Sequence, residues 1–159
     1  MRTPAAIDVL LEEARRGMDR VQPADLASEL TAGALVVDTR PADQRQRDGD
    51  LPGAVIIDRN VLEWRLDPTC PHHIPQVRTA DVRIIVVCNE GYSSSLAAAT
   101  LRQLGLSRAT DLIGGFQGWK QFCHESTPTR YRGPSAVQRS CPFHTCCGEK
   151  VRSSAGGSG

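Results

Sequence analysis

Four β-branched apolar residues stand in a row at positions 84–87. A short apolar run without polar alternation is typical of a strand that is buried on both faces, as in a parallel sheet. Apolar runs at 35–37 and 54–57, and the segment 109–113, predict three more strands. Val21-Gln22 adds a short edge strand, which brings the expected total to about five.

Helical patterns fill most of the intervals between these runs. Pro23 suits the first turn of a helix over 24–31, and Gly33 follows as its terminator. Strands that alternate with helices from about residue 20 to 124 predict an α/β fold with a single open parallel β-sheet covered by helices on both faces. The other expected helices cover 61–66, 93–104 and 116–122, whereas 41–50 is a short helix or loop and 67–75 a loop.

The two ends of the chain have a different character. Apolar residues at 7, 10, 11, 14 and 18 form one stripe of an amphipathic helix, which either packs on the domain or serves dimerisation. From residue 126 the sequence reads as a linker and a flexible tail rich in Gly and Ser. We therefore divide the chain into an N-terminal amphipathic helix (1–18), an α/β domain (19–125), and a C-terminal linker with a cysteine-containing tail (126–159).

Composition narrows the function classes. A net charge of +1 over 159 residues argues against a general nucleic-acid binder. No apolar run approaches the roughly 20 residues that a membrane-spanning helix needs, and the N-terminus lacks the form of a secretory signal. We expect a cytoplasmic protein with reduced cysteines and no membrane or nucleic-acid partner.

Cys88 is the residue most suited to chemistry. It ends the predicted strand 84–87, and a short polar loop with Gly91 leads into a helix for which Ser93, Ser94 and Ser95 are all candidate N-cap residues. Backbone N–H groups of the loop and the helix dipole would favour the thiolate, the nucleophilic form. The alternative is an inert buried thiol; Gly91 favours a closed, anion-binding loop.

Four segments resemble the motifs of rhodanese-like sulfurtransferases. These are a strand ending in Asp-x-Arg at 35–40, a Gly-x-x-Pro-Gly-Ala segment at 49–54 with Asp50 where histidine is usual, the cysteine loop at 88–93, and Gly-Gly-x-x-x-Trp at 114–119. The resemblance covers roughly residues 20–124. It implies the rhodanese fold and a transfer of sulfane sulfur, from a donor such as thiosulfate to cyanide or a thiol, through a persulfide on Cys88 without any cofactor.

The other expected site residues lie in the cysteine loop and near the carboxyl ends of neighbouring predicted strands. Arg59 follows the strand 54–57 and either binds substrate at the same sheet edge or has a surface role. Asp38 and Arg40 support the site structurally. The expected substrate-binding loop consists of Asn89, Glu90, Gly91, Tyr92, Ser93 and Ser94.

Two features of the loop bear on its reaction. Related phosphatases have a longer loop that ends in arginine, whereas residues 88–93 contain none, so an ester hydrolase is disfavoured. The family loop carries basic residues, but here Glu90 would cost an anion about 6 Å away roughly 3 kcal/mol at an effective dielectric of about 20. Either Glu90 points to solvent, or an arginine such as Arg59, Arg40 or Arg65 compensates, or the donor is not anionic.

Several alternatives stay open. The chain could be a regulatory or protein-binding module on the same fold without turnover, although retention of Cys88 favours an enzyme. A protein acceptor for the sulfur is a further option. Two groups contain potential metal ligands, but neither matches a standard zinc site and we expect no metal. They are Cys70, His72 and His73, and in the tail Cys141, His144, Cys146 and Cys147, which could also relay sulfur or be disordered.

Overall fold

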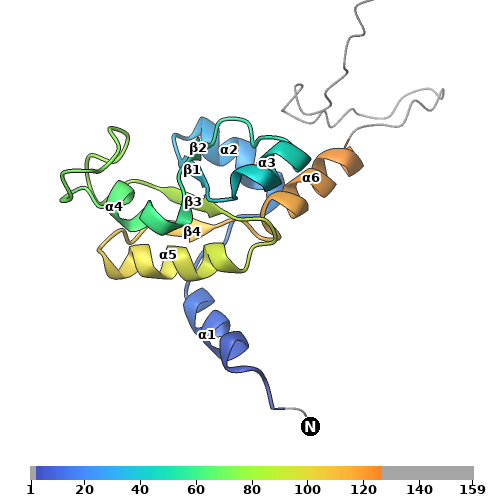
Figure 1. Cartoon of the computed structure of the whole chain (residues 1–159), viewed down its shortest axis with the longest axis horizontal. Coiled ribbons are helices and arrows are strands. Elements are labelled where there is room, and N and C mark those ends of the chain that lie inside the picture. The colour runs from blue at the N-terminus through green and yellow to red at the C-terminus, as the bar shows by residue number, and fades with distance from the viewer. Residues whose placement is uncertain (1–2, 127–159) are drawn as a thin grey trace, which may run out of the picture.

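A computed structural model describes residues 3–126 of the chain. Its centre is an open sheet of four parallel strands in the order β2-β1-β3-β4 (Figure 1). This arrangement confirms the predicted α/β class with a parallel sheet. The strands are β1 (Leu35–Asp38), β2 (Val55–Ile56), β3 (Ile84–Val87) and β4 (Ala109–Asp111).

Helices cover the sheet and follow the predicted intervals. None of those within residues 3–126 is both long enough and apolar enough to cross a membrane. The helices are α1 (Ala6–Arg15), η1 (Pro23–Asp25), α2 (Leu26–Thr31), α3 (Ala42–Asp48), η2 (Arg59–Val61), α4 (Leu62–Leu66), α5 (Ser93–Gln103) and α6 (Gly115–Ser126).

Two hydrophobic cores lie on opposite faces of the sheet. Ile84 and Val86 of β3 pack in one core, with apolar residues of α4 and α5. Ile85 and Val87 pack in the other, with residues of α2 and α6. Because successive side chains of a strand point to opposite faces, burial of all four residues requires a helical layer on each side. The expected cover on both faces is confirmed.

The sheet has one strand fewer than the expected total of about five. Val21 makes only an isolated parallel bridge to Leu112. Pro23 begins η1 two residues later, which ends any pairing beyond that bridge. Strand β2 is also shorter than the predicted 54–57, and Ile56 is half exposed because β2 lies at the edge of the sheet.

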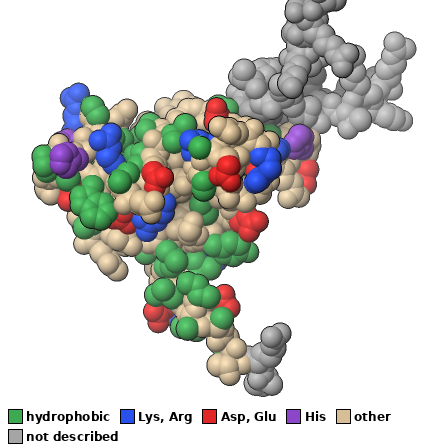
Figure 2. All heavy atoms as spheres, in the orientation of Figure 1, with side chains coloured by type: hydrophobic (Ala, Val, Ile, Leu, Met, Phe, Trp, Pro, Cys, Tyr) green, Lys and Arg blue, Asp and Glu red, His purple; other side chains and the backbone are tan. Residues whose placement is uncertain are grey.

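Helix α1 extends from the sheet-and-helix body and contacts α5 (Figure 1). None of its residues is buried, and Ile7, Val9 and Leu10 are among the large exposed apolar residues. Figure 2 shows hydrophobic side chains along this helix. Its C-terminal residue, Arg15, nevertheless reaches the loop that follows β3, as described below.

Candidate active site

The loop after β3 places Cys88 at the carboxyl edge of the sheet, where ligands bind in open α/β folds. The residue is 7% exposed. Its carbonyl oxygen accepts a hydrogen bond from the Phe116 N–H at 2.8 Å, which joins the loop to the start of α6. The sulfur therefore occupies a fixed, nearly enclosed position in front of the N-terminus of α5.

Polar groups converge on the sulfur. The backbone N–H groups of Gly91 and Ser94 donate to Sγ at 3.2 and 3.4 Å, and the Cys88 thiol donates to the Ser94 hydroxyl oxygen at 3.2 Å. Burial raises the pKa of the Cys88 thiol. Hydrogen bonds from the hydroxyls of Ser93 and Ser94 and from these two amides outweigh burial, so the pKa lies below its ordinary value. A lowered pKa favours the nucleophilic thiolate.

Two glycines allow the loop to close this tightly. Gly91 has φ +80°, and a Cβ atom there would lie 2.9 Å from the backbone nitrogen of Gly114. Gly115 has φ +58°, and a Cβ atom there would lie 2.5 Å from the carbonyl oxygen of Cys88. Contacts of this kind with backbone atoms exclude any side chain. The Gly-Gly pair at 114–115 thus packs directly beneath the cysteine loop.

The remaining loop residues differ in their exposure. Glu90 is exposed, Ser93 is exposed although its hydroxyl hydrogen-bonds Cys88, and Tyr92 is 59% exposed. Solvent exposure of Glu90 agrees with the first of the three explanations offered for its charge. Asn89 is half-buried, and its Oδ1 accepts a hydrogen bond from the Gln117 amide at 3.0 Å.

The expected N-caps of α5 are wrong. Tyr92 occupies the N-cap position, and it makes no side-chain capping bond. The hydroxyls of Ser94 and Ser95 instead donate to Asp111 Oδ2 at 2.9 and 2.7 Å. A buried carboxylate is a stronger acceptor partner than a neutral backbone group, so these serines turn inward.

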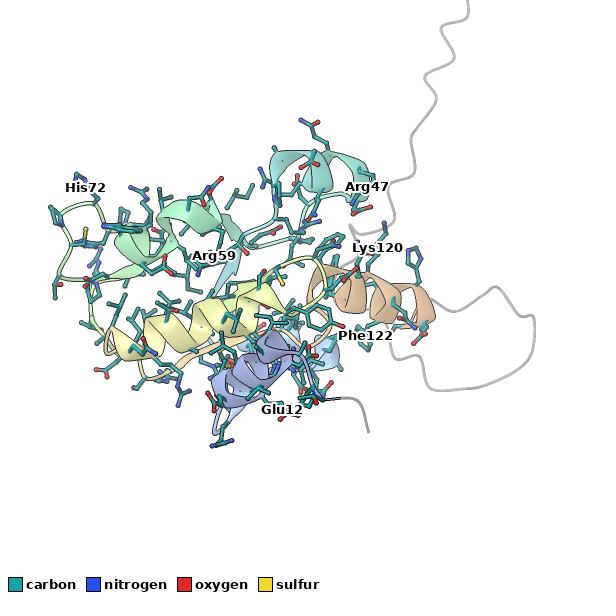
Figure 3. The ribbon with its side chains drawn as sticks, turned by 60° about the horizontal axis from the view of Figure 1, so that its bottom comes forward. Glu12, Arg47, Arg59, His72, Lys120 and Phe122 are labelled. Atoms are coloured by element: carbon teal, nitrogen blue, oxygen red, sulfur yellow. The ribbon has the colours of Figure 1, made fainter. Side chains whose placement is uncertain are left out.

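Arg59 is engaged by a neighbour on its own segment. Its Nη1 lies 2.8 Å from Glu63 Oε1, four residues later, and the Arg59 side chain is 40% exposed. Figure 3 shows it beside α4. This ion pair agrees with the surface alternative that we gave for Arg59.

Asp38 and Arg40 form a buried structural pair. Arg40 Nη2 lies 2.7 Å from Asp38 Oδ2, and the guanidinium carbon lies 3.5 Å from the centre of the Phe116 ring. Arg40 also donates to the Gly49 carbonyl at 3.0 Å. These contacts connect the end of β1 to α3 and α6.

Three residues near the sulfur were not predicted. Arg15 and Arg20 both donate to the carbonyl oxygen of Gly91, at 2.8 and 3.2 Å. Arg20 also binds the fully buried Asp111 carboxylate, with Nε 2.7 Å from Oδ1. Arg15 donates to the Ser95 hydroxyl at 3.0 Å. No local sequence pattern predicts these contacts, because they join residues that are 71 to 91 positions apart in the chain.

The remaining cysteines and histidines are candidate metal ligands by residue type. Within residues 3–126, no group of three or more His, Cys, Asp or Glu side chains is placed to hold a metal ion. In that part of the chain, Cys70 is a free, partly exposed thiol. The tail cluster of Cys141, His144, Cys146 and Cys147 lies outside the described residues.

Comparisons with known proteins agree with this geometry. The chain is 32% identical over 117 residues to the adenylyltransferase and sulfurtransferase UBA4 of Candida albicans, covering 69% of this chain and 25% of that relative. It is 31% identical over 104 residues to the thiosulfate sulfurtransferase GlpE of Stutzerimonas stutzeri, covering 64% and 84%. It therefore spans about a quarter of the yeast relative and most of the bacterial one.

A solved structure adds a similar fold. A Rhodopseudomonas palustris protein of unknown function, described as a possible tyrosine phosphatase, matches with a TM-score of 0.66 at 29% identity over 77% of this chain and 94% of that one. The model of the family described as "Rhodanese-like domain" matches residues 22–122, well over half of the chain. With the parallel sheet, the cysteine loop and the Gly-Gly pair beneath it, this match shows that the chain belongs to the rhodanese-like domain family.

Proposed function

We propose that this protein is a sulfurtransferase that moves a sulfane sulfur from a donor such as thiosulfate to a thiophilic acceptor through a persulfide on Cys88. The observation that carries the proposal is the position of the sulfur. Two backbone N–H groups and the Ser94 hydroxyl surround it, and its pKa is lowered. A thiolate stabilised in this way is a nucleophile that needs no cofactor.

The reaction has two half-reactions. The Cys88 thiolate attacks the outer sulfur of thiosulfate, an S–S bond forms on the enzyme, and the S–S bond of the donor breaks to release sulfite. Cyanide then takes the outer sulfur as thiocyanate, or a thiol takes it as a persulfide, and the thiolate is regenerated. The N–H groups of Gly91 and Ser94 suit both charged species because they are fixed before reaction.

The loop accepts a donor or acceptor from the solvent side. Exposed Glu90 does not lie in a low-dielectric environment, so water weakens its repulsion of anionic thiosulfate. Tyr92, in the cysteine loop, is exposed and offers an aromatic contact to an acceptor larger than cyanide, including a protein. We therefore keep thiosulfate as the donor and leave both small and protein acceptors within the proposal.

Hydrolysis of a phosphate ester fits the loop less well, although one structural neighbour is described as a possible tyrosine phosphatase. Residues 88–93 contain no arginine. Arg15 and Arg20 come close, but both donate to the Gly91 carbonyl oxygen rather than toward the sulfur. A phosphoryl group in the loop would therefore lack a bidentate guanidinium contact.

Steady-state kinetics test this proposal. With thiosulfate and cyanide both varied, thiocyanate formation should give the parallel double-reciprocal lines of a covalent intermediate. Cys88→Ser should abolish the activity, whereas Cys70→Ser, which changes a cysteine outside the site, should retain it.

Absence of turnover with both thiosulfate and an organic persulfide would contradict the proposal and favour the non-catalytic module. Hydrolysis of p-nitrophenyl phosphate that depends on Cys88 would favour the phosphatase instead.

A further inference from the structure

A buried carboxylate lies directly behind the reactive sulfur. Asp111, the last residue of β4, has no exposed surface. Its two oxygens accept hydrogen bonds from Arg20 Nε at 2.7 Å, Arg20 Nη2 at 3.1 Å, and the hydroxyls of Ser94 and Ser95. A buried charge requires such partners, because an unpaired carboxylate away from water is strongly unfavourable.

The Ser94 hydroxyl stands between this carboxylate and Cys88. Its oxygen is 3.2 Å from Sγ and 2.9 Å from Asp111 Oδ2. A serine hydroxyl has a single proton to donate. While Cys88 is a thiol, it can donate to the Ser94 oxygen as Ser94 donates to Asp111. When Cys88 is a thiolate, the sulfur and the carboxylate compete for that one proton.

The position of Arg20 weakens the carboxylate as an acceptor of the Ser94 proton. Its fork binds both oxygens of Asp111, and its Nη2 also donates to the Gly91 carbonyl at 3.2 Å. The cation offsets the carboxylate charge that would otherwise repel the thiolate through a short, buried path. It also fixes the Gly91 residue whose N–H points at the sulfur.

We propose that Arg20 is a positioning residue for Cys88: by binding Asp111 it frees the Ser94 proton for the thiolate and orients the Gly91 amide. This inference rests on the proposed role of Cys88 as the nucleophile. The hydrogen bonds of Arg20 go to Asp111 and Gly91, so it acts on the sulfur through Asp111, Ser94 and Gly91.

Other charged groups surround the loop, and most have partners of their own. In the loop itself, Glu90 is exposed. Neighbouring elements contribute Arg15 of α1 on the Gly91 carbonyl, the Asp38–Arg40 pair at the end of β1, the Arg59–Glu63 pair of η2 and α4, and Asp48 of α3 with Arg47 and Lys120. Among the described residues, Asp111 accepts the hydroxyl of Ser94, a direct partner of the sulfur, and Arg15 and Arg20 bind the carbonyl oxygen of Gly91, another direct partner.

The test is the alkylation rate of Cys88 as a function of pH, followed by mass spectrometry on the tryptic peptide 84–102, whose only cysteine is Cys88. Four variants of the full chain are compared with the wild type. They are Arg20→Gln, Asp111→Asn, the double variant, and Arg16→Gln as an exposed-arginine control. Alkylation needs no sulfur donor, so this test stays separate from the test of sulfur transfer.

Arg20→Gln should slow alkylation at neutral pH about tenfold and move the profile to higher pH, because the Asp111 charge is no longer offset. Asp111→Asn should not slow it. The double variant should recover most of the wild-type rate, and Arg16→Gln should leave the rate unchanged.

A purely structural role for Arg20 predicts no such recovery, since the second substitution removes further contacts. The proposal is overturned if Arg20→Gln reacts within about twofold of wild type, or if the double variant is as slow as Arg20→Gln. Should Arg20→Gln fail to fold, Asp111→Asn decides alone, and slower alkylation in that variant overturns the proposal.

Discussion

Two arginine–aspartate pairs lie at the carboxyl edge of the sheet, and they are built differently. Arg40 binds Asp38 only two residues away, and the two side chains are 0% and 1% exposed. Arg20 binds Asp111 across 91 residues of sequence, with the arginine 16% exposed and the aspartate fully buried. The first pair is local and sealed, whereas the second joins the N-terminal segment to β4 and stays in partial contact with water.

Their neighbours show what the difference means. Arg40 contacts the Gly49 carbonyl and the Phe116 ring, so it holds α3 and α6 at the sheet edge. Arg20 reaches the Gly91 carbonyl, and its partner Asp111 accepts the Ser94 hydroxyl that touches the sulfur. The Asp38–Arg40 pair stabilises the edge of the fold, and we infer that the Arg20–Asp111 pair influences the charge on the Cys88 sulfur.

Arg40→Ala should have the largest effect on stability of the variants at these two pairs. It leaves Asp38 buried without its cation, which typically costs about 3–5 kcal/mol in the free energy of unfolding. Urea denaturation followed by circular dichroism measures the loss. The exposed Arg47 is a matched control, and Arg47→Ala should unfold near the wild-type midpoint. A loss below about 1 kcal/mol for Arg40→Ala would contradict its structural role.

Arg20→Gln should have a smaller effect on stability, about 1–3 kcal/mol. Arg20 is partly solvated, and Asp111 keeps two serine hydroxyls. The same urea experiment, together with Cys88 alkylation of the folded variant, separates the two pairs. The conservative variant Arg40→Lys should lower stability and leave the intrinsic reactivity of Cys88 near that of the wild type, whereas Arg20→Gln should change both. An equal loss of Cys88 reactivity in the two variants would remove the distinction.

Ser94→Ala tests the link between the second pair and the sulfur. The Ser94 hydroxyl helps to lower the pKa of Cys88. Because the folded pKa is lowered, the thiolate contributes to the stability of the folded protein above the unfolded pKa, and this contribution is lost as pH falls through the folded pKa. Loss of the hydroxyl raises the Cys88 pKa and lowers the thiolate fraction at neutral pH. The variant should be alkylated about three- to tenfold more slowly at neutral pH, and at the wild-type rate at alkaline pH, where both proteins are thiolates.

Ser95→Ala is the control for Ser94→Ala, since the Ser95 hydroxyl binds Asp111 and the Gly91 carbonyl and makes no contact with Sγ. Its pH profile should stay closer to that of the wild type. A larger shift in Ser95→Ala than in Ser94→Ala would contradict the direct role of Ser94.

Glu90→Gln should give the smallest effect. Glu90 is exposed, so removing its charge should raise kcat/KM for thiosulfate only about two- to fivefold at low salt, and less at high salt. Glu12 on α1 is the control, since Glu12→Gln removes an exposed charge from another element (Figure 3). A gain that persists in high salt would show that Glu90 acts at close range.

The local pair was accessible from sequence, and the long-range pair was not. The Asp-x-Arg motif after an apolar run places Asp38 and Arg40 together by chain connectivity alone. The strand pattern and the Gly-Gly segment likewise gave the sheet and the cysteine loop. Arg20 follows no periodic pattern, and its contact with Asp111 depends on how the N-terminal segment crosses the sheet edge.

The serines of the loop show a second limit of local reasoning. Ser94 and Ser95 have the residue type and position of helix caps, and local rules assign them to the backbone of α5. Tertiary structure brings the buried Asp111 carboxylate within 2.9 Å of both hydroxyls and redirects them. Burial of a charge thus overrides a local preference worth about 1 kcal/mol.

The central claim is that Cys88 carries the sulfur. The most direct measurement is the intact mass of the protein before and after treatment with thiosulfate, with Cys88→Ser alongside. We predict a gain of one sulfur atom in the wild type that cyanide reverses and that the variant lacks. An equal gain in Cys88→Ser, or no gain in the wild type with either thiosulfate or an organic persulfide, would contradict the account.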